Sequence, residues 1–266
     1  MTYMKVALLQ MTVTDREEEN LDCAEAYVME AAAKGADFAM LPEMFCCPYE
    51  TACFAHFAQK TGGERWQRLS ALARRAGLYL VAGSVPECDG GRIYNTSYVF
   101  DRSGAQLTRH RKAHLFDIDI PRGQVYRESD VLSPGEEPTV FQTEFGPMGL
   151  MICFDIRFAE MTMEMARQRV RAIFVPAAFN PTTGPLHWEL LFRARAVDGQ
   201  CYLLGAAPAC NESASYHSYG HSIAVSPWGK VLAQLDETMG TVLVTLDPAL
   251  PDAVRGQIPL LQSRKW

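Results

Sequence analysis

Residues 5–41 read KVALLQMTVTDREEENLDCAEAYVMEAAAKGADFAML. The apolar runs Lys5 to Leu9 and Asp37 to Leu41 are typical of buried strands, because nearly every side chain in them is hydrophobic. The intervening segment, Arg16 to Lys34, predicts a helix that ends at Gly35 in the left-handed conformation. This order of strand, helix and strand is the building unit of an α/β fold.

The same order recurs along the chain. Helices are expected near residues 64–75, 158–169 and 188–197, and the apolar strands that follow them at residues 78–84, 172–176 and 202–206. Hairpin turns are expected at residues 89–91, 102–104, 146–149, 227–229 and 238–240. Hairpins join antiparallel strands, so the pattern predicts mixed sheets with helices outside and favours two sheets packed face to face.

Composition restricts the class of protein. The 266 residues, 48% hydrophobic and without an internal repeat or long linker, indicate one continuous domain spanning residues 1–266. The formal charge of −6 argues against nucleic acid and anionic lipid as partners. No secretory signal and no apolar run long enough for a membrane helix are visible, which favours a cytoplasmic protein. The eight cysteines include no CxxC pair, so we expect reduced thiols and no metal site.

Three segments carry a reactive side chain at or just beyond the end of an expected strand. They are FAMLPE ending at Glu43, TRHRK ending at Lys112 and GLMICFD containing Cys153. A helix that starts just after Cys153 would favour its thiolate, although a buried, inert cysteine is the alternative. Strand ends are where rigid scaffolds present catalytic groups.

Glu43 and Lys112 also have two interpretations each. A carboxylate beside Met44 and Phe45 is expected to be partly desolvated, which raises its pKa toward that of a general base. The alternative is a solvated loop glutamate. The Lys112 ammonium is suited to stabilise a negative oxygen, and its alternative is an exposed charge on an edge strand.

These segments resemble the nitrilase-like carbon–nitrogen hydrolases, whose catalytic glutamate, lysine and cysteine occur in this order. The similarity runs from Lys5 to about Leu261 and includes LPEMF, RKAHLFD and MICFDIRFAE. The chain is most similar to the omega-amidase branch. The segments that carry this likeness are HLFDIDIP at 114–121, ES at 128–129, FNPTTGPLHWELL at 179–191 and RARAVD at 193–198.

The resemblance implies a four-layer α-β-β-α sandwich with two mixed sheets, assembled as a homodimer. It implies that Cys153 is the nucleophile, Glu43 the general base and Lys112 an oxyanion donor beside the backbone N–H of Phe154. Glu128 matches the glutamate that orients the lysine and the substrate amide. Phe154 stands where relatives often carry tyrosine, which leaves that N–H unchanged. No cofactor and no metal are implied.

Substrate-binding residues follow from the same resemblance. Arg157 and Thr183 match residues that hold the distal carboxylate in omega-amidases, and an arginine fork beside a hydroxyl suits that task. Tyr49 is expected to line the same pocket. The alternative for Arg157 is an ordinary surface ion pair with Glu160 or Glu164.

The expected reaction is hydrolysis of the terminal amide of a small dicarboxylic monoamide, 2-oxoglutaramate or 2-oxosuccinamate, through a Cys153 thioester. Related alternatives are a deaminated-glutathione amidase and another family amidase or carbamoylase. Two further alternatives are a non-catalytic scaffold that binds a small acid or a protein, and a Cys–His hydrolase. The candidate bases of the latter are His110, His114, His187 and His221. Zinc binding by the first two of these is disfavoured, because their segment is an expected strand without HExxH.

Overall fold

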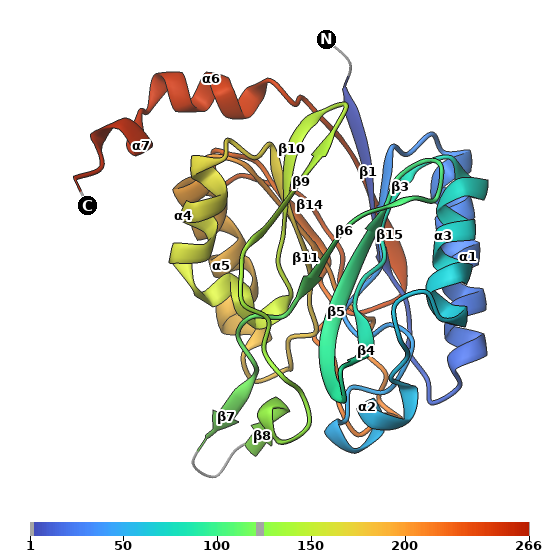
Figure 1. Ribbon diagram of the computed structural model, residues 1–266. Helices are drawn as coiled ribbons and strands as arrows, with labels where there is room; N and C mark the ends of the chain where they lie inside the picture. Colours follow the sequence, from blue (N-terminus) through green and yellow to red (C-terminus); the bar gives the residue numbers. More distant parts are fainter. Residues whose placement is uncertain (1–2, 121–124, 266) are drawn as a thin grey trace.

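The computed structural model describes residues 3–120 and 125–265. Two β-sheets lie face to face between two layers of helices (Figure 1). Helices α1 (Glu17–Ala33) and α3 (Glu64–Ala76) cover one sheet, and α4 (Ala159–Arg167) and α5 (Gly184–Gly199) cover the other. The expected α-β-β-α sandwich is therefore confirmed.

Both large sheets are mixed. Among the described residues, the first has seven strands, in the order β15 (Gly240–Leu246), β1 (Met4–Gln10), β2 (Phe38–Met40), β3 (Tyr79–Val81), β5 (Arg92–Phe100) and β4 (Val85–Asp89), with β6 (Gln106–Arg111) also paired to β5. The second has the order β14 (Val231–Gln234), β13 (Ile223–Val225), β12 (Tyr202–Ala206), β11 (Ala172–Pro176), β10 (Gly146–Leu150) and β9 (Thr139–Thr143). The strands that flank helices are parallel and the hairpin strands are antiparallel, as expected from the sequence.

Smaller elements lie at the ends of the sandwich. Strands β7 (Asp117–Asp119) and β8 (Val125–Arg127) form a short two-stranded sheet, followed by the 3₁₀ turn η1 (Glu128–Asp130). A second 3₁₀ turn, η2 (Cys153–Arg157), connects β10 to α4. The remaining helices are α2 (Thr51–Phe57), α6 (Leu250–Gln257) and α7 (Leu260–Ser263). In Figure 1, α6 and α7 extend away from the helices that cover the sheets.

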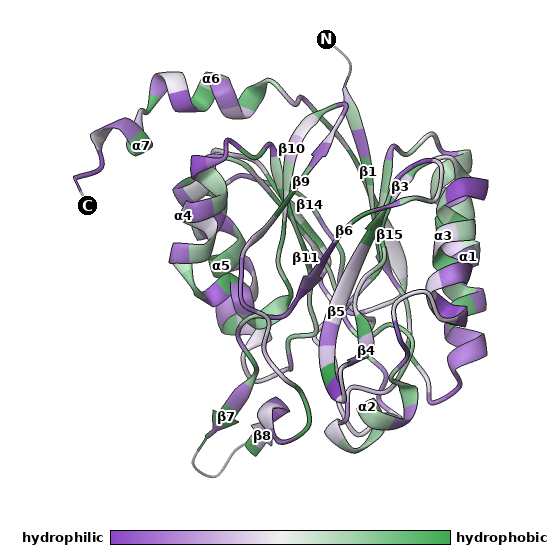
Figure 2. Ribbon diagram, viewed as in Figure 1, coloured by the Kyte–Doolittle hydropathy of each residue, from purple (hydrophilic) through white to green (hydrophobic). Residues whose placement is uncertain are grey.

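Alternate side chains of the strands fill different layers of the core. In β1, Val6 and Leu8 point between the two sheets, whereas Ala7 and Leu9 face α1. Phe38 lies in the central layer and stacks on Phe174 of the opposite sheet, with ring centroids 5.2 Å apart. Since both faces of the central strands are buried, their sequences are continuously apolar (Figure 2).

Two of the five expected hairpins are wrong in detail. Residues 238–240 connect the second sheet to the first, because β15 pairs with β1 along seven residues, from Met4 opposite Leu246 to Gln10 opposite Gly240. Residues 146–149 lie within β10 rather than in a turn, and β9 and β10 are joined through residues 144–145. Gly146, the first residue of β10, has φ +103°, a conformation that favours glycine. It therefore marks the end of the turn.

The helix expected near residues 188–197 begins earlier, at Gly184, with Pro185 in its first turn. Proline is favoured there because the first turn of a helix needs no N–H donor from it. Among the helices of the described segments, none combines the length and hydrophobicity needed to cross a membrane.

Candidate active site

Glu43, Lys112 and Cys153 meet at one end of the sandwich, and each follows the end of a different strand. Glu43 follows β2, Lys112 follows β6 and Cys153 follows β10. Ala178, just beyond β11, lies against the same group. Four segments that are far apart in the sequence therefore contribute to one buried cluster.

The carboxylate of Glu43 is held on both oxygens. Oε1 accepts hydrogen bonds from Lys112 Nζ at 3.0 Å and from Asn95 Nδ2 at 2.9 Å. Oε2 accepts from the backbone N–H of Ala178 at 2.8 Å. Burial raises the pKa of Glu43, the Lys112 ammonium opposes that shift and the Glu128 carboxylate adds to it. The expected raised pKa is therefore confirmed, and it suits a general base.

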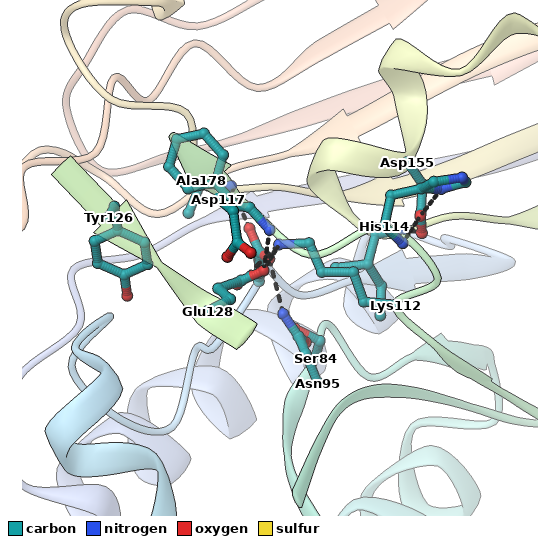
Figure 3. A network of polar contacts seen from close by, with 12 residues as sticks. Ser84, Asn95, Lys112, His114, Asp117, Tyr126, Glu128, Asp155 and Ala178 are labelled. Atoms are coloured by element: carbon teal, nitrogen blue, oxygen red, sulfur yellow. Dashed lines mark hydrogen bonds and ion pairs between the residues drawn. The ribbon is translucent and has the colours of Figure 1, made fainter. Parts of the chain in front are cut away.

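Lys112 lies between two carboxylates in the interior. Its side chain and that of Glu128 are both 0% exposed, and Nζ donates to Glu128 Oε1 at 2.9 Å (Figure 3). The other oxygen of Glu128 accepts from the backbone N–H of Phe116 at 2.6 Å. Although burial alone would lower the pKa of Lys112, Glu128 and Glu43 raise it well above its usual value. The site therefore contains a fixed ammonium.

Cys153 occupies a left-handed backbone conformation, with φ +45°, at the start of η2. A non-glycine residue there costs about 1–3 kcal/mol, and such strain is common at functional sites. Burial raises the pKa of the thiol well above its usual value, and the Glu43 carboxylate, with which it forms a hydrogen bond, raises it further. The expectation of a resting thiolate is therefore wrong: burial and Glu43 outweigh Lys112 and the short turn. The neutral thiol donates to Glu43.

Asp155 organises the turn that bears Cys153. Its Oδ2 accepts from Ile152 N at 3.0 Å, and its Oδ1 accepts from His114 N at 2.9 Å. The ring nitrogens of His110 and His114 lie 2.9 and 2.8 Å from the same carboxylate. Figure 3 shows His114 beside Asp155. Asp155 thereby joins the segment that bears Lys112 to the segment that bears Cys153.

These contacts bear on the Cys–His alternative. His110 and His114 face Asp155, His187 Nδ1 lies 3.2 Å from Arg157 Nη1, and His221 Nδ1 lies 2.6 Å from the carbonyl of Tyr219. The side chain that accepts the thiol hydrogen bond of Cys153 is Glu43. The geometry therefore favours a glutamate base.

Arg157 and Thr183 lie together in a small cavity that reaches Cys153. Its remaining walls are Phe116, Phe154, Ala178 and Phe179. The guanidinium carbon of Arg157 is 5.4 Å from the ring centroid of Phe154 and 5.1 Å from that of Phe179. The arrangement brings the sulfur, an arginine and a hydroxyl into one aromatic-lined space.

Arg157 is a cation without a carboxylate partner in the described segments. Its Nε is buried and lacks a hydrogen-bond partner, and burial lowers its pKa. The surface pairs considered from the sequence do not form: Glu164 pairs with Arg167, and Glu160 has no ion pair within the described residues. A buried arginine without a carboxylate partner is suited to bind an anion.

Tyr49 occupies a different place from the one expected. Its hydroxyl donates to Glu128 Oε1 at 2.6 Å and lies 3.2 Å from Lys112 Nζ and from Glu43 Oε1. It lines a second cavity of about 420 Å³ that also reaches Glu43. The structure thus groups Tyr49 with the charged cluster, away from the cavity that contains Arg157.

Sequence reasoning missed several groups that hold the cluster. Asn95 is a buried polar residue within strand β5, a signal that points to a specific hydrogen bond. Asp155 acts through contacts with residues 114 and 152, and the residue type alone does not indicate the first of these. Ala178 acts through its backbone N–H, for which no side-chain signal exists. In the part of the chain that the structure describes, no group of three or more His, Cys, Asp or Glu side chains is arranged to hold a metal ion.

The fold and this cluster define a class of enzyme. The family model for carbon-nitrogen hydrolases matches residues 5–255, so the chain belongs to the carbon–nitrogen hydrolase family. It is 44% identical over 265 residues to omega-amidase NIT2 of Xenopus tropicalis, covering 100% of this chain and 96% of that protein. The identity to omega-amidase NIT2 of Homo sapiens is 42%, with the same coverage.

A solved structure agrees with this assignment. Nit3 of Saccharomyces cerevisiae, described as a member of branch 10 of the nitrilase superfamily, matches with a TM-score of 0.91 and 38% identity. The match covers 99% of this chain and 97% of Nit3. The fold is therefore that of the nitrilase superfamily, and the resemblance inferred from the sequence motifs is confirmed.

Proposed function

We propose that this enzyme is a thiol amidase that hydrolyses the terminal amide of small dicarboxylic monoamides, such as 2-oxoglutaramate and 2-oxosuccinamate. The products are the dicarboxylate and ammonia. One observation carries the proposal. The Cys153 thiol, hydrogen-bonded to the buried carboxylate of Glu43, shares a cavity with Arg157, which lacks an anionic partner. The omega-amidase names of the relatives support the same choice.

In the acylation step, the Cys153 sulfur attacks the amide carbon while its proton passes to Glu43. The Lys112 ammonium and the backbone N–H of Phe154 stabilise the negative oxygen, and such a donor contributes about 3 kcal/mol. Phe154 N lies in the first turn of η2, where amides have no acceptor within the helix. Glu43 then protonates the nitrogen, the C–N bond breaks, and ammonia leaves a Cys153 thioester.

In the deacylation step, Glu43 takes a proton from water, which attacks the thioester carbon. The same ammonium and N–H stabilise the second tetrahedral intermediate, and the C–S bond breaks as the proton returns to sulfur. Glu128 and Tyr49 position Lys112 during both steps through the hydrogen bonds that they share with it. A neutral thiol beside a carboxylate of raised pKa suits this cycle, because the proton moves between two adjacent groups.

Arg157 selects the substrate by binding its distal carboxylate. A guanidinium fork pairs with a carboxylate through two parallel hydrogen bonds, and the surrounding phenylalanine rings strengthen the pair by excluding water. Thr183 lines the same cavity, and its hydroxyl donates to Asn180 Oδ1. A local cation of this kind allows a protein of net charge −6 to bind an acid.

We also propose that two copies associate in the cytoplasm. Large apolar side chains are exposed on α5 and beside it, namely Leu186, Leu190, Val197 and Trp228. A contiguous exposed patch of this kind is typical of an interface. All eight cysteines are free, which agrees with a reducing compartment. Sedimentation velocity tests the assembly, and a monomer at micromolar concentration would contradict it.

A substrate panel tests the activity. We expect ammonia release from 2-oxoglutaramate and 2-oxosuccinamate to exceed release from nitriles and N-carbamoyl compounds, and to exceed cleavage of deaminated glutathione. Intact-mass measurement during turnover is expected to detect an acyl adduct that Cys153→Ala lacks. A histidine-to-asparagine replacement at His221 is the control, because that ring faces Tyr219 rather than the thiol or Arg157. Absence of hydrolysis and of any adduct would favour the binding scaffold.

A further inference from the structure

The guanidinium of Arg157 contacts a histidine that does not line the cavity around it. Nη1 of Arg157 lies 3.2 Å from Nδ1 of His187, a residue of helix α5. We propose that His187 is a positioning residue, which turns the Nε–Nη2 edge of Arg157 toward the distal carboxylate of the substrate. This inference rests on the proposed function, in which Arg157 binds that carboxylate.

The chemistry of the two groups fixes the direction of this hydrogen bond. A guanidinium has five N–H donors and no acceptor, and it stays protonated in proteins. Nδ1 of His187 must therefore accept, which requires a neutral imidazole that carries its proton on Nε2. Since the ring brings no negative charge, it orients the cation and leaves the charge available to an anion.

The bond to His187 leaves one edge of the guanidinium for the substrate. A carboxylate can pair with a guanidinium through Nη1 and Nη2, or through Nε and Nη2. His187 contacts Nη1, whereas Nε is buried and has no hydrogen-bond partner among the described residues. The Nε–Nη2 edge can therefore bind both carboxylate oxygens without displacing a bond that the protein has already made.

Helix α5 holds the backbone of Arg157 as well as its guanidinium. Nε of Arg195 donates to the carbonyl of Ile156 at 2.9 Å, and Nη2 of Arg195 donates to the carbonyl of Arg157 at 3.2 Å. Residues 187 and 195 are eight positions apart, a spacing that puts both on one face of a helix. The two ends of Arg157 are thus attached to the same helix.

The aromatic walls of the cavity do not fix the rotation of the guanidinium. Its carbon lies 5.4 Å from the ring centroid of Phe154 and 5.1 Å from that of Phe179. A cation–π contact attracts the charge but does not select which N–H points at the ligand, whereas a hydrogen bond is directional. Without His187, the guanidinium must be ordered when the substrate binds, which weakens binding.

The experiment measures the steady-state kinetics of His187→Leu on succinamate and on butyramide, a neutral amide of the same length. We expect KM for succinamate to rise about tenfold, the size of one hydrogen bond to a charged group, and kcat to change less than about threefold. The constants for butyramide should change less than about threefold, because it lacks the carboxylate. A merely structural role of His187 would affect both amides equally.

Three replacements serve as controls. His187→Phe keeps an aromatic ring and removes the acceptor, so it should raise KM as His187→Leu does. His187→Asn has its amide oxygen in the place of Nδ1, so KM should stay within about threefold of that of the natural enzyme. His56→Leu makes the same chemical change on the exposed surface of α2, where the ring contacts Phe57, and it should leave all constants unchanged.

A double-mutant cycle tests whether His187 acts through Arg157. In an Arg157→Ala background, His187→Leu should raise KM for succinamate no further. Additive effects, an equal loss on both amides, or a KM that His187→Asn fails to restore would overturn the inference and leave the proposed function intact. A KM for succinamate that Arg157→Ala does not change would overturn both the inference and the proposed role of Arg157.

Discussion

The charged cluster around Glu43 and the cavity around Arg157 are neighbours that differ in whether their charged groups have hydrogen-bond partners. In the cluster, Lys112 has two carboxylates as partners, and both oxygens of Glu43 accept hydrogen bonds. In the cavity, Arg157 has a buried Nε without a partner and two aromatic rings around it. The protein therefore completes one site by itself and leaves the other incomplete.

This difference separates two tasks. Groups that stabilise a transition state must be fixed in advance, because reorganisation during the reaction raises its barrier. A group that binds a substrate must instead retain free hydrogen-bonding capacity for it. We infer that the first region determines turnover and the second determines substrate affinity, and the following predictions test that division.

The largest effect is expected from Glu43→Gln, which removes the proton acceptor and keeps the shape of the side chain. We expect kcat to fall about 10²–10⁴-fold, as is typical when a general base is lost. Steady-state release of ammonia measures the effect, and circular dichroism of the same sample verifies folding. A folded variant that retains a tenth of the activity would contradict the role of Glu43.

A smaller effect is expected from Arg157→Ala, and it should appear in KM. Loss of a hydrogen-bonded charge pair costs up to about 3 kcal/mol, so we expect a rise in KM of about 100-fold for succinamate. A neutral amide of equal length, such as butyramide, should be affected less. The comparison of the two substrates isolates the carboxylate contact.

Thr183→Val is the matched control in the same cavity. The Thr183 hydroxyl already donates to Asn180 Oδ1 at 2.9 Å, so its proton is directed away from the substrate. We expect KM to change about threefold or less. If Arg157→Ala lowered kcat for both amides equally and left KM unchanged, the division between the two regions would be wrong.

A smaller effect than those of Glu43→Gln and Arg157→Ala is expected from Glu128→Gln, and it concerns pH. The pKa of Glu43 is raised above the ordinary glutamate value of 4.5, so the acidic limb of the pH profile of kcat/KM should lie above pH 4.5. The negative charge of Glu128 contributes to that rise. Removing this charge lowers the pKa of Glu43, and the limb should move to lower pH.

The accompanying loss in kcat is expected to be about tenfold, because one hydrogen bond from a charged donor to Glu128 is weakened. Tyr49→Phe removes a hydroxyl from the same cluster without changing its charge, and it should move the limb less. A limb that shifts to higher pH in Glu128→Gln would contradict the electrostatic relation between the two carboxylates.

The sequence alone was sufficient for the repeated strand and helix units and for three of the five hairpin turns. Continuous apolar strands such as residues 172–176 and 202–206 are recognisable because both of their faces are buried. The turn at residues 238–240 was misassigned because a glycine-containing turn does not show whether the next strand stays in the same sheet. The pairing of β15 with β1 depends on residues more than 200 positions apart.

The motifs also predicted which residues lie together in one cluster, since Glu43, Lys112 and Cys153 each follow a strand whose position is set by the fold. Only the tertiary structure decided the charge on Cys153, the place of Tyr49 and the support from Asn95 and Ala178. The physical reason is that a residue's type specifies its chemical group, whereas its pKa and partners depend on burial and on neighbours from distant segments.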